Sequence, residues 1–175
     1  MKNEKIQKLV LSALFAALAA VMTMVIQIPS PMQGYVNLGD CAVLLAAWIL
    51  GPAYGAAAAG IGSMMADLLS GYAHYAPGTL IIKYAMALAA AMILRKAAEG
   101  SDYKHILSRQ ILGGILAEAV MVLGYFFYCS LFLGKGLAAA SSIPGNIVQG
   151  VIGLITAVIV YGILYKSHAL KKLPR

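Results

Sequence analysis

The sequence predicts an all-α integral membrane protein, a single domain over residues 1–175 that forms a bundle of six transmembrane helices with both termini in the cytoplasm. Hydrophobic residues make up 62% of the chain and charged residues only 11%, and the mean hydropathy is +0.85. A soluble domain carries about 25% charged and about 45–50% apolar residues. The composition therefore requires a bilayer as solvent, and no linker rich in Ser or Pro divides the chain.

The positions of the basic residues agree with this topology. All 13 Lys and Arg residues except Lys83 and Lys135 fall within residues 1–8, 95–109 and 166–175. Basic residues beside apolar spans mark the cytoplasmic side of a membrane protein. The net charge of +7 is thus explained by topology, and nucleic acid is not an expected partner.

The first three helices are predicted to follow one another with short connections. A helix needs about 20 apolar residues to cross the hydrocarbon core. The first covers Ile6–Ile28, which is too long for the apolar part of a signal peptide, and Pro29 ends it because proline cannot continue the hydrogen-bond ladder. The second covers Leu38–Leu50 and the third Ala53–Leu69, with Gly51-Pro52 as a tight connection between them.

The last three helices are predicted over Thr79–Ile93, Arg109–Leu133 and Ile143–Tyr165. Six crossings place the 95–109 connection on the same side as both termini. Three connections are left for the outer side, at residues 29–37, 71–78 and 134–142. The chain shows no internal repeat, which argues against a secondary transporter built from inverted repeats.

Four ionisable side chains lie inside the apolar spans. Such a group costs at least a few kcal/mol at membrane depth, so it normally faces a cavity, a partner or a solute path. Asp40 lies at the start of the second helix, where a carboxylate suits the positive end of the helix dipole and caps free amides. Asp67 is predicted either to pair with Lys83 or to contact a ligand, and Lys83 either meets the ligand or extends to lipid headgroups. Glu118 lies nearer the inner half and has interhelical packing as its alternative role.

The outer connection 71–78 is the most informative loop for function. It carries Tyr72, His74 and Tyr75 between glycines, and aromatic groups clustered in this way can close over a flat heterocycle. An interfacial aromatic belt is the alternative explanation. Phenol, amide and charged groups elsewhere complete a hydrogen-bonding wall. The candidate substrate-binding residues are Tyr35, Asn37, Asp40, Asp67, Tyr72, His74, Tyr75, Lys83, Glu118, Tyr125, Asn146 and Gln149.

A stripe of small residues runs along the first helix at Ala13, Ala16, Ala17 and Ala20. Small residues let a second helix approach closely, which is how helices associate in lipid. The stripe is therefore a candidate surface for docking a separate membrane subunit, with packing against this chain's own helices as the alternative.

The sequence gives no sign of catalysis or of a cofactor. Cys41 and Cys129 are far apart, the three histidines have no metal-ligand spacing, and no Gly-x-Ser-Gly or HExxH motif is present. We therefore expect a protein that is not an enzyme and that holds no metal or cofactor.

Three segments stand out beside the alanine stripe: Asn37-Leu-Gly-Asp40, Ala66-Asp-Leu-Leu-Ser-Gly71 and Ala76-Pro-Gly-Thr-Leu-Ile-Ile-Lys83. In these residues the chain resembles the substrate-binding S components of energy-coupling factor (ECF) vitamin transporters. The resemblance implies a six-helix binding subunit in the plasma membrane of a prokaryote, surrounded by lipid. The alanine stripe would dock onto a transmembrane coupling protein that carries two ABC ATPases. The outer connections 29–37 and 71–78 would form the lid and the wall of a vitamin site.

The identity of the vitamin stays open within one group. The chain has a single tryptophan, Trp48, which is placed near the inner end of the second helix and far from a site for a thiazolium cation. Tyrosines, amides and one lysine suit a neutral hydroxylated heterocycle, such as hydroxymethylpyrimidine, pyridoxine or riboflavin. A self-sufficient secondary transporter of a polar heterocycle is the main alternative, and a membrane scaffold without a ligand is a further one.

Overall fold

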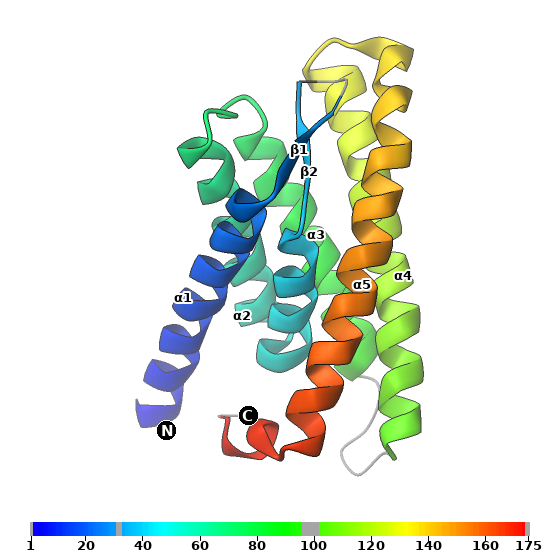
Figure 1. Ribbon diagram of the computed structural model, residues 1–175. Coiled ribbons are helices and arrows are strands. Elements are labelled where there is room, and N and C mark those ends of the chain that lie inside the picture. Colours follow the sequence, from blue (N-terminus) through cyan, green and yellow to red (C-terminus); the bar gives the residue numbers. More distant parts are fainter. Residues whose placement is uncertain (1, 31–32, 96–101, 174–175) are drawn as a thin grey trace.

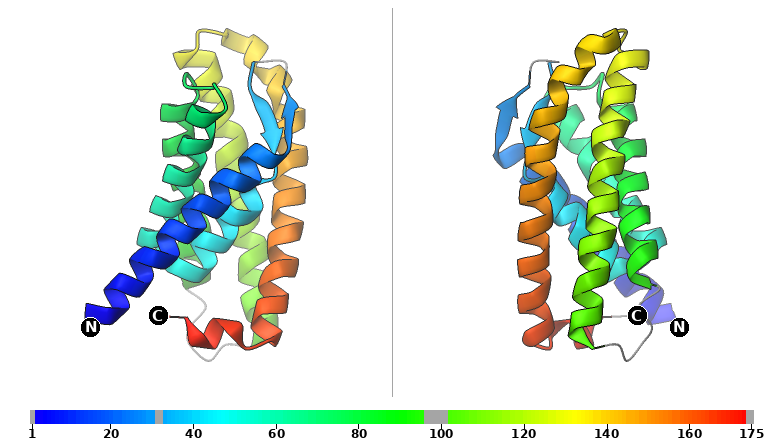
Figure 2. Two further views of the ribbon diagram at one scale, coloured as in Figure 1. Left: turned by 60° about the vertical axis from the view of Figure 1, so that its left-hand side comes forward. Right: turned by 90° about the vertical axis from the view of Figure 1, so that its right-hand side faces the viewer.

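The computed structural model describes residues 2–30, 33–95 and 102–173. In these residues it contains five helices that are long and apolar enough to cross a membrane, and they lie side by side in an elongated bundle (Figures 1 and 2). The five are α1 (Lys2–Val25), α2 (Gly39–Leu69), α3 (Ala76–Arg95), α4 (Tyr103–Phe127) and α5 (Ile143–Lys166). The predicted all-α membrane class is confirmed, whereas the count of candidate spans is five and not six.

The difference in count comes from α2, which contains both the second and the third predicted helix. Its 31 residues are interrupted at Gly51, where φ is 77° and ψ is −174°. Only glycine adopts this region of φ and ψ without strain, and Pro52 follows as the first residue of the second half. A Cβ atom on Gly55 would lie 2.4 Å from the carbonyl oxygen of Ala46. Nine residues of straight helix would separate these two by about 13 Å, so the two halves of α2 fold back on each other.

A short β-hairpin lies at the end of the bundle opposite the start of α1 (Figure 1). The strands β1 (Gln27–Pro29) and β2 (Tyr35–Asn37) pair antiparallel, with Ile28 opposite Val36. The prediction that the first helix continues to Ile28 was therefore wrong. Residues approaching Pro29 are biased toward extended backbone, and the ladder with β2 satisfies their polar groups.

Other boundaries also differ from the predictions: α1 begins at Lys2 rather than Ile6, α4 ends at Phe127 rather than Leu133, and two later helices begin earlier than predicted. The fourth predicted helix begins at Ala76 rather than Thr79, because Pro77 fits the first turn, where the amides have no helical partner. The fifth begins at Tyr103 rather than Arg109, directly after Asp102, whose backbone is extended. Beyond α4 the chain forms the π-helical turn η1 (Tyr128–Phe132) and the 3-10 helix η2 (Gly136–Ser142). The short η3 (Ala169–Lys172) follows α5.

Small residues fill the interior, and large apolar side chains cover much of the outside. Ala42, Ala46, Ala56 and Ala59 of α2 are at most 1% exposed, which allows α2 to pack closely against α1 and α3. On α1, in contrast, Leu9, Val10 and Leu14 are each about 60% exposed. An apolar exterior around a tightly packed interior is the arrangement that hydrocarbon requires.

Candidate binding site

A partly open cavity lies under the β-hairpin and is lined by residues of all five long helices. Its volume is about 40 Å³, counted as the space open to the centres of water molecules. The lining side chains are mostly polar and come from every major element of the fold. They are Thr23, Ser30, Gly34, Tyr35, Asn37, Ser63, Asp67, Tyr75, Thr79, Lys83, Tyr125, Cys129, Ser142, Asn146 and Gln149.

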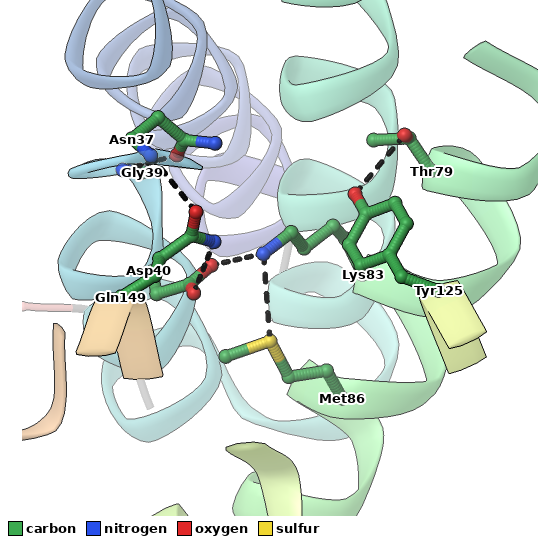
Figure 3. Close-up of polar contacts among 8 residues, drawn as sticks. All are labelled: Asn37, Gly39, Asp40, Thr79, Lys83, Met86, Tyr125 and Gln149. Carbon is green, nitrogen blue, oxygen red and sulfur yellow. Dashed lines mark hydrogen bonds and ion pairs between the residues drawn. The ribbon is translucent and has the colours of Figure 1, made fainter. Parts of the chain in front are cut away.

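The floor of the cavity is a chain of buried polar contacts (Figure 3). The Lys83 ammonium on α3 forms an ion pair with Asp40 Oδ1 on α2. Asp40 Oδ2 accepts a hydrogen bond of 2.7 Å from Gln149 Nε2 on α5, and Gln149 Oε1 accepts one of 2.8 Å from the backbone amide of Asn37. Lys83 also lies 5.7 Å from the ring centroid of Tyr125. These contacts join four helices (α2, α3, α4 and α5) and β2.

This network corrects two of the predictions. Lys83 pairs with Asp40 and not with Asp67, because both Lys83 and Asp40 point inward at the same depth while Asp67 lies higher on the wall. Asp40 does not cap α2 either. The side-chain oxygen of Asn37 takes that role instead and accepts a 2.8 Å hydrogen bond from the Gly39 amide.

One wall of the cavity carries Asp67 and Ser63, one turn apart on the second half of α2. Both are buried, at 4% and 1% exposure. Asp67 Oδ1 accepts a 2.6 Å hydrogen bond from the Tyr35 hydroxyl on β2, which ties the hairpin to α2. Burial, together with this hydrogen bond and the charge of Asp67, raises the pKa of Tyr35, so its hydroxyl stays a donor.

The aromatic loop contributes less to the lining than its sequence suggests. Of Tyr72, His74 and Tyr75, only Tyr75 lines the cavity. Tyr72 packs against the ring of Tyr35 at 4.6 Å between centroids, and His74 packs against Tyr75 at 4.8 Å. Tyr72 and His74 therefore support the side chains that face the cavity, rather than facing it themselves.

Glu118 lies outside the cavity lining. It is 8% exposed on α4 and sits against α5, where a Cβ atom on Gly150 would lie 2.9 Å from Glu118 Oε2. Within the described part of the chain, neither of its carboxylate oxygens has a hydrogen-bond partner. Glu118 is therefore not among the lining residues, and interhelical packing stays its predicted alternative role. Asp40 is likewise absent from the lining, being 0% exposed in its ion pair with Lys83.

The sequence did not single out the small hydroxyl and thiol groups of the cavity as site residues. They are Thr23, Ser30, Ser63, Thr79, Cys129 and Ser142. Such residues are common in membrane helices, and no spacing between them marks a site. Only their position in the folded chain distinguishes them, as with Thr79, whose hydroxyl lies 3.0 Å from that of Tyr125.

The alanine stripe of α1 divides between two environments. A Cβ atom on Gly62 of α2 would lie 2.2 Å from the carbonyl oxygen of Ala16, so this part of the stripe packs within the chain. Ala13 and Ala17 are exposed on the outside of α1, and Ala20 is half-buried. The stripe therefore has both an internal and an external face.

Comparison with known proteins gives consistent results. Residues 3–166 match the family described as ECF-type riboflavin transporter, S component. An uncharacterised protein of Pyrococcus woesei is 38% identical over 136 residues, which cover 77% of this chain and 86% of that protein. The thiamine precursor transporter HmpT of Lactococcus lactis subsp. cremoris (strain MG1363) is 28% identical over 173 residues, covering 97% and 95%.

The fold also has a counterpart among solved structures. The S component of a bacterial ECF transporter superposes with a TM-score of 0.68, covering 95% of this chain and 98% of that one. The sequence identity is 19%, so the likeness concerns the fold.

Proposed function

The chain belongs to the family of ECF-type riboflavin transporter S components, the non-enzymatic substrate-binding subunits of ECF importers for vitamins and their precursors, and from this premise we propose that its cavity captures a vitamin or precursor with a single ring. Within the group predicted from the sequence, hydroxymethylpyrimidine and pyridoxine fit this description better than riboflavin. The HmpT relative, named as a thiamine precursor transporter, supports the same choice.

The size of the cavity carries this proposal. Its 40 Å³ corresponds to about three water molecules, at roughly 10–15 Å³ for each water centre. Because one water occupies about 30 Å³ of liquid, a ligand that replaces them has roughly 100 Å³ of space. A substituted six-membered ring is of this order, whereas a tricyclic flavin with its ribityl chain is several times larger. Polar groups on all sides favour a ligand with several hydrogen-bonding substituents.

The orientation in the membrane is part of the same proposal. The start of α1 and the end of α5 lie at one end of the bundle, and the β-hairpin lies at the other (Figure 1). The basic residues Lys5, Lys8 and Lys166 belong to the first end, whereas Tyr35 and Asn37 of the hairpin line the cavity. By the positive-inside rule, the basic end is cytoplasmic and the cavity opens toward the outside of the plasma membrane. The two halves of α2 then count as separate helices of a six-helix bundle.

Small molecules released from the purified, detergent-solubilised protein test the proposal. Mass spectrometry is expected to find one single-ring vitamin or precursor in near-stoichiometric amount. Asn146→Ala, which removes an amide from the cavity, should lower the recovered amount about tenfold or more, because a buried partner is left unpaired. Asn3→Ala, the same change at an exposed position, should not. An empty protein that shows no thermal shift with any vitamin or precursor would refute the proposal.

We further propose that Ala13 and Ala17 form the contact with a transmembrane coupling protein, which itself carries two ABC ATPases. Their exposure and small size on a membrane-facing helix support this assignment. Ala17→Trp is expected to abolish ATP-driven uptake in cells that carry the ATPase module, while ligand affinity of the isolated subunit stays unchanged. Leu116→Trp, at another exposed position on α4, is the control and should retain uptake. Equal uptake in both variants would place the docking surface elsewhere.

A further inference from the structure

The wall formed by Asp67 and Ser63 carries two polar atoms that the fold itself does not use. Asp67 Oδ2 and Ser63 Oγ are buried and have no hydrogen-bond partner among the residues described. Both side chains line the cavity. The Thr79 hydroxyl lies beside the same carboxylate, but its close partner is the Tyr125 hydroxyl at 3.0 Å. A buried acceptor left in this state costs about 1–3 kcal/mol, more when it is charged, so a cavity occupant that bonds to it gains this energy.

The charges around the cavity favour an occupant that donates hydrogen bonds. Lys83 is the buried cation of the site, and its ammonium is paired with Asp40. Among the described residues, Asp67 has no cation in direct contact, and Lys83 and His74 act on it from a greater distance. With two carboxylates facing one ammonium, the site is acidic. An anionic group on the ligand would meet repulsion there, while an N–H group meets an unused acceptor.

The relative positions of the two atoms define the expected partner more closely. Ser63 and Asp67 are four residues apart on one helix, so their side chains lie next to each other on the same face. Tyr35 occupies Oδ1 of Asp67 and thereby fixes the carboxylate, leaving Oδ2 as the acceptor for a ligand. The Ser63 hydroxyl beside it can donate. The wall therefore offers an acceptor next to a donor.

We propose that Asp67 and Ser63 are the specificity-determining pair of the cavity and that they recognise a ring edge with an amino group next to a ring nitrogen. The amino group donates to Asp67 Oδ2, and the ring nitrogen accepts from Ser63 Oγ. An oxo group in place of the amino group reverses this pattern, because it turns an acceptor toward the carboxylate and an N–H group toward the hydroxyl. The inference rests on the proposed single-ring substrate and adds the edge by which that ring is selected.

Isothermal titration calorimetry with two matched ligands tests this pairing. The probes are 4-amino-5-hydroxymethyl-2-methylpyrimidine and its 4-oxo counterpart, which differ only at the proposed edge. The wild-type protein in detergent is expected to prefer the amino ring by at least 100-fold in Kd. Asp67→Asn should reduce this preference by roughly 10- to 100-fold, as for loss of a hydrogen bond to a charged acceptor. Ser63→Ala should reduce it by a smaller factor, because a neutral bond is lost.

Two further variants separate selectivity from general effects. Tyr35→Phe removes the contact between β2 and Asp67 but leaves Oδ2 in place, so affinity for both rings should fall by a similar factor. Asp102→Asn, the same change as Asp67→Asn at an exposed site, should alter neither Kd. A preference that persists in both Asp67→Asn and Ser63→Ala overturns the pairing while leaving the binding function intact. Failure of the wild type to bind any single-ring vitamin or precursor overturns the proposed function, and the pairing with it.

Discussion

Replacing Lys83 with Met is expected to lower the free energy of unfolding of the unliganded protein by about 3–5 kcal/mol. The ammonium of Lys83 forms an ion pair with Asp40, and the two side chains are 3% and 0% exposed. Methionine has a similar length but no charge, so the variant leaves a carboxylate inside the bundle with the Gln149 amide as its one side-chain partner in the described part of the chain. The energy of an unpaired buried charge is much larger than that of a lost surface contact.

Thermal unfolding in detergent, without ligand, measures this effect. The double variant Asp40→Asn/Lys83→Met removes both charges and should recover most of the lost stability, because Asn keeps a side-chain oxygen for Gln149. Lys104→Met, which removes an exposed lysine at the start of α4, is the control and should change little. A Lys83→Met protein as stable as the wild type would show that the ion pair is not a structural element of the cavity floor.

Replacing Gly62 with Leu is expected to lower the free energy of unfolding by about 3 kcal/mol, the upper end of the range for an overpacked interior. The Cβ atom would lie 2.2 Å from the carbonyl oxygen of Ala16, well inside contact distance. The obstacle is backbone and cannot rotate away, so α1 has to move off α2. Because Thr23 near the end of α1 lines the cavity, ligand affinity should fall as well.

The neighbouring position provides the control for this variant. Ile61 is 49% exposed on the same turn, and Ile61→Leu should leave stability within about 0.5 kcal/mol of the wild type. Thermal unfolding and the Kd for the recovered ligand measure both effects. Unchanged stability of Gly62→Leu would mean that α1 is not held against α2 at Ala16.

The positions of the helices were largely predictable from the sequence, because long apolar runs and prolines determine them without reference to distant residues. The relation between the two halves of α2 was not, since it depends on the φ angle of Gly51 and on the fit of Gly55 against Ala46. The strand at Gln27–Pro29 was also missed, because its partner lies across the hairpin at Tyr35–Asn37. Short strands that depend on pairing leave little signal in the local sequence.

Part of the candidate site was also predictable from local sequence features alone. Polar residues in an apolar span are conspicuous, and Asp67, Lys83, Asn146 and Gln149 all line the cavity. Their partners were not predictable, because the apolar spans contain several carboxylates and the sequence does not show which of them Lys83 contacts. Depth and direction within the bundle decide that Lys83 meets Asp40. Glu118 shows the opposite case, a conspicuous residue that the packing of α4 on α5 keeps away from the cavity.

The break at Gly51 has a consequence for the lipid around the protein. The first half of α2, residues 39–50, has a length of about 18 Å at 1.5 Å per residue, whereas the hydrocarbon layer is about 30 Å thick. Its polar start at Asp40 therefore falls near the middle of the bilayer, where other elements of the bundle shield it from the acyl chains. The apolar part of the protein between the cavity floor and the far membrane surface is therefore about 18 Å thick, little more than half of the hydrocarbon layer. The short first half of α2 is buried from Gly39 to Trp48, so its length does not set the thickness of the lipid around the protein.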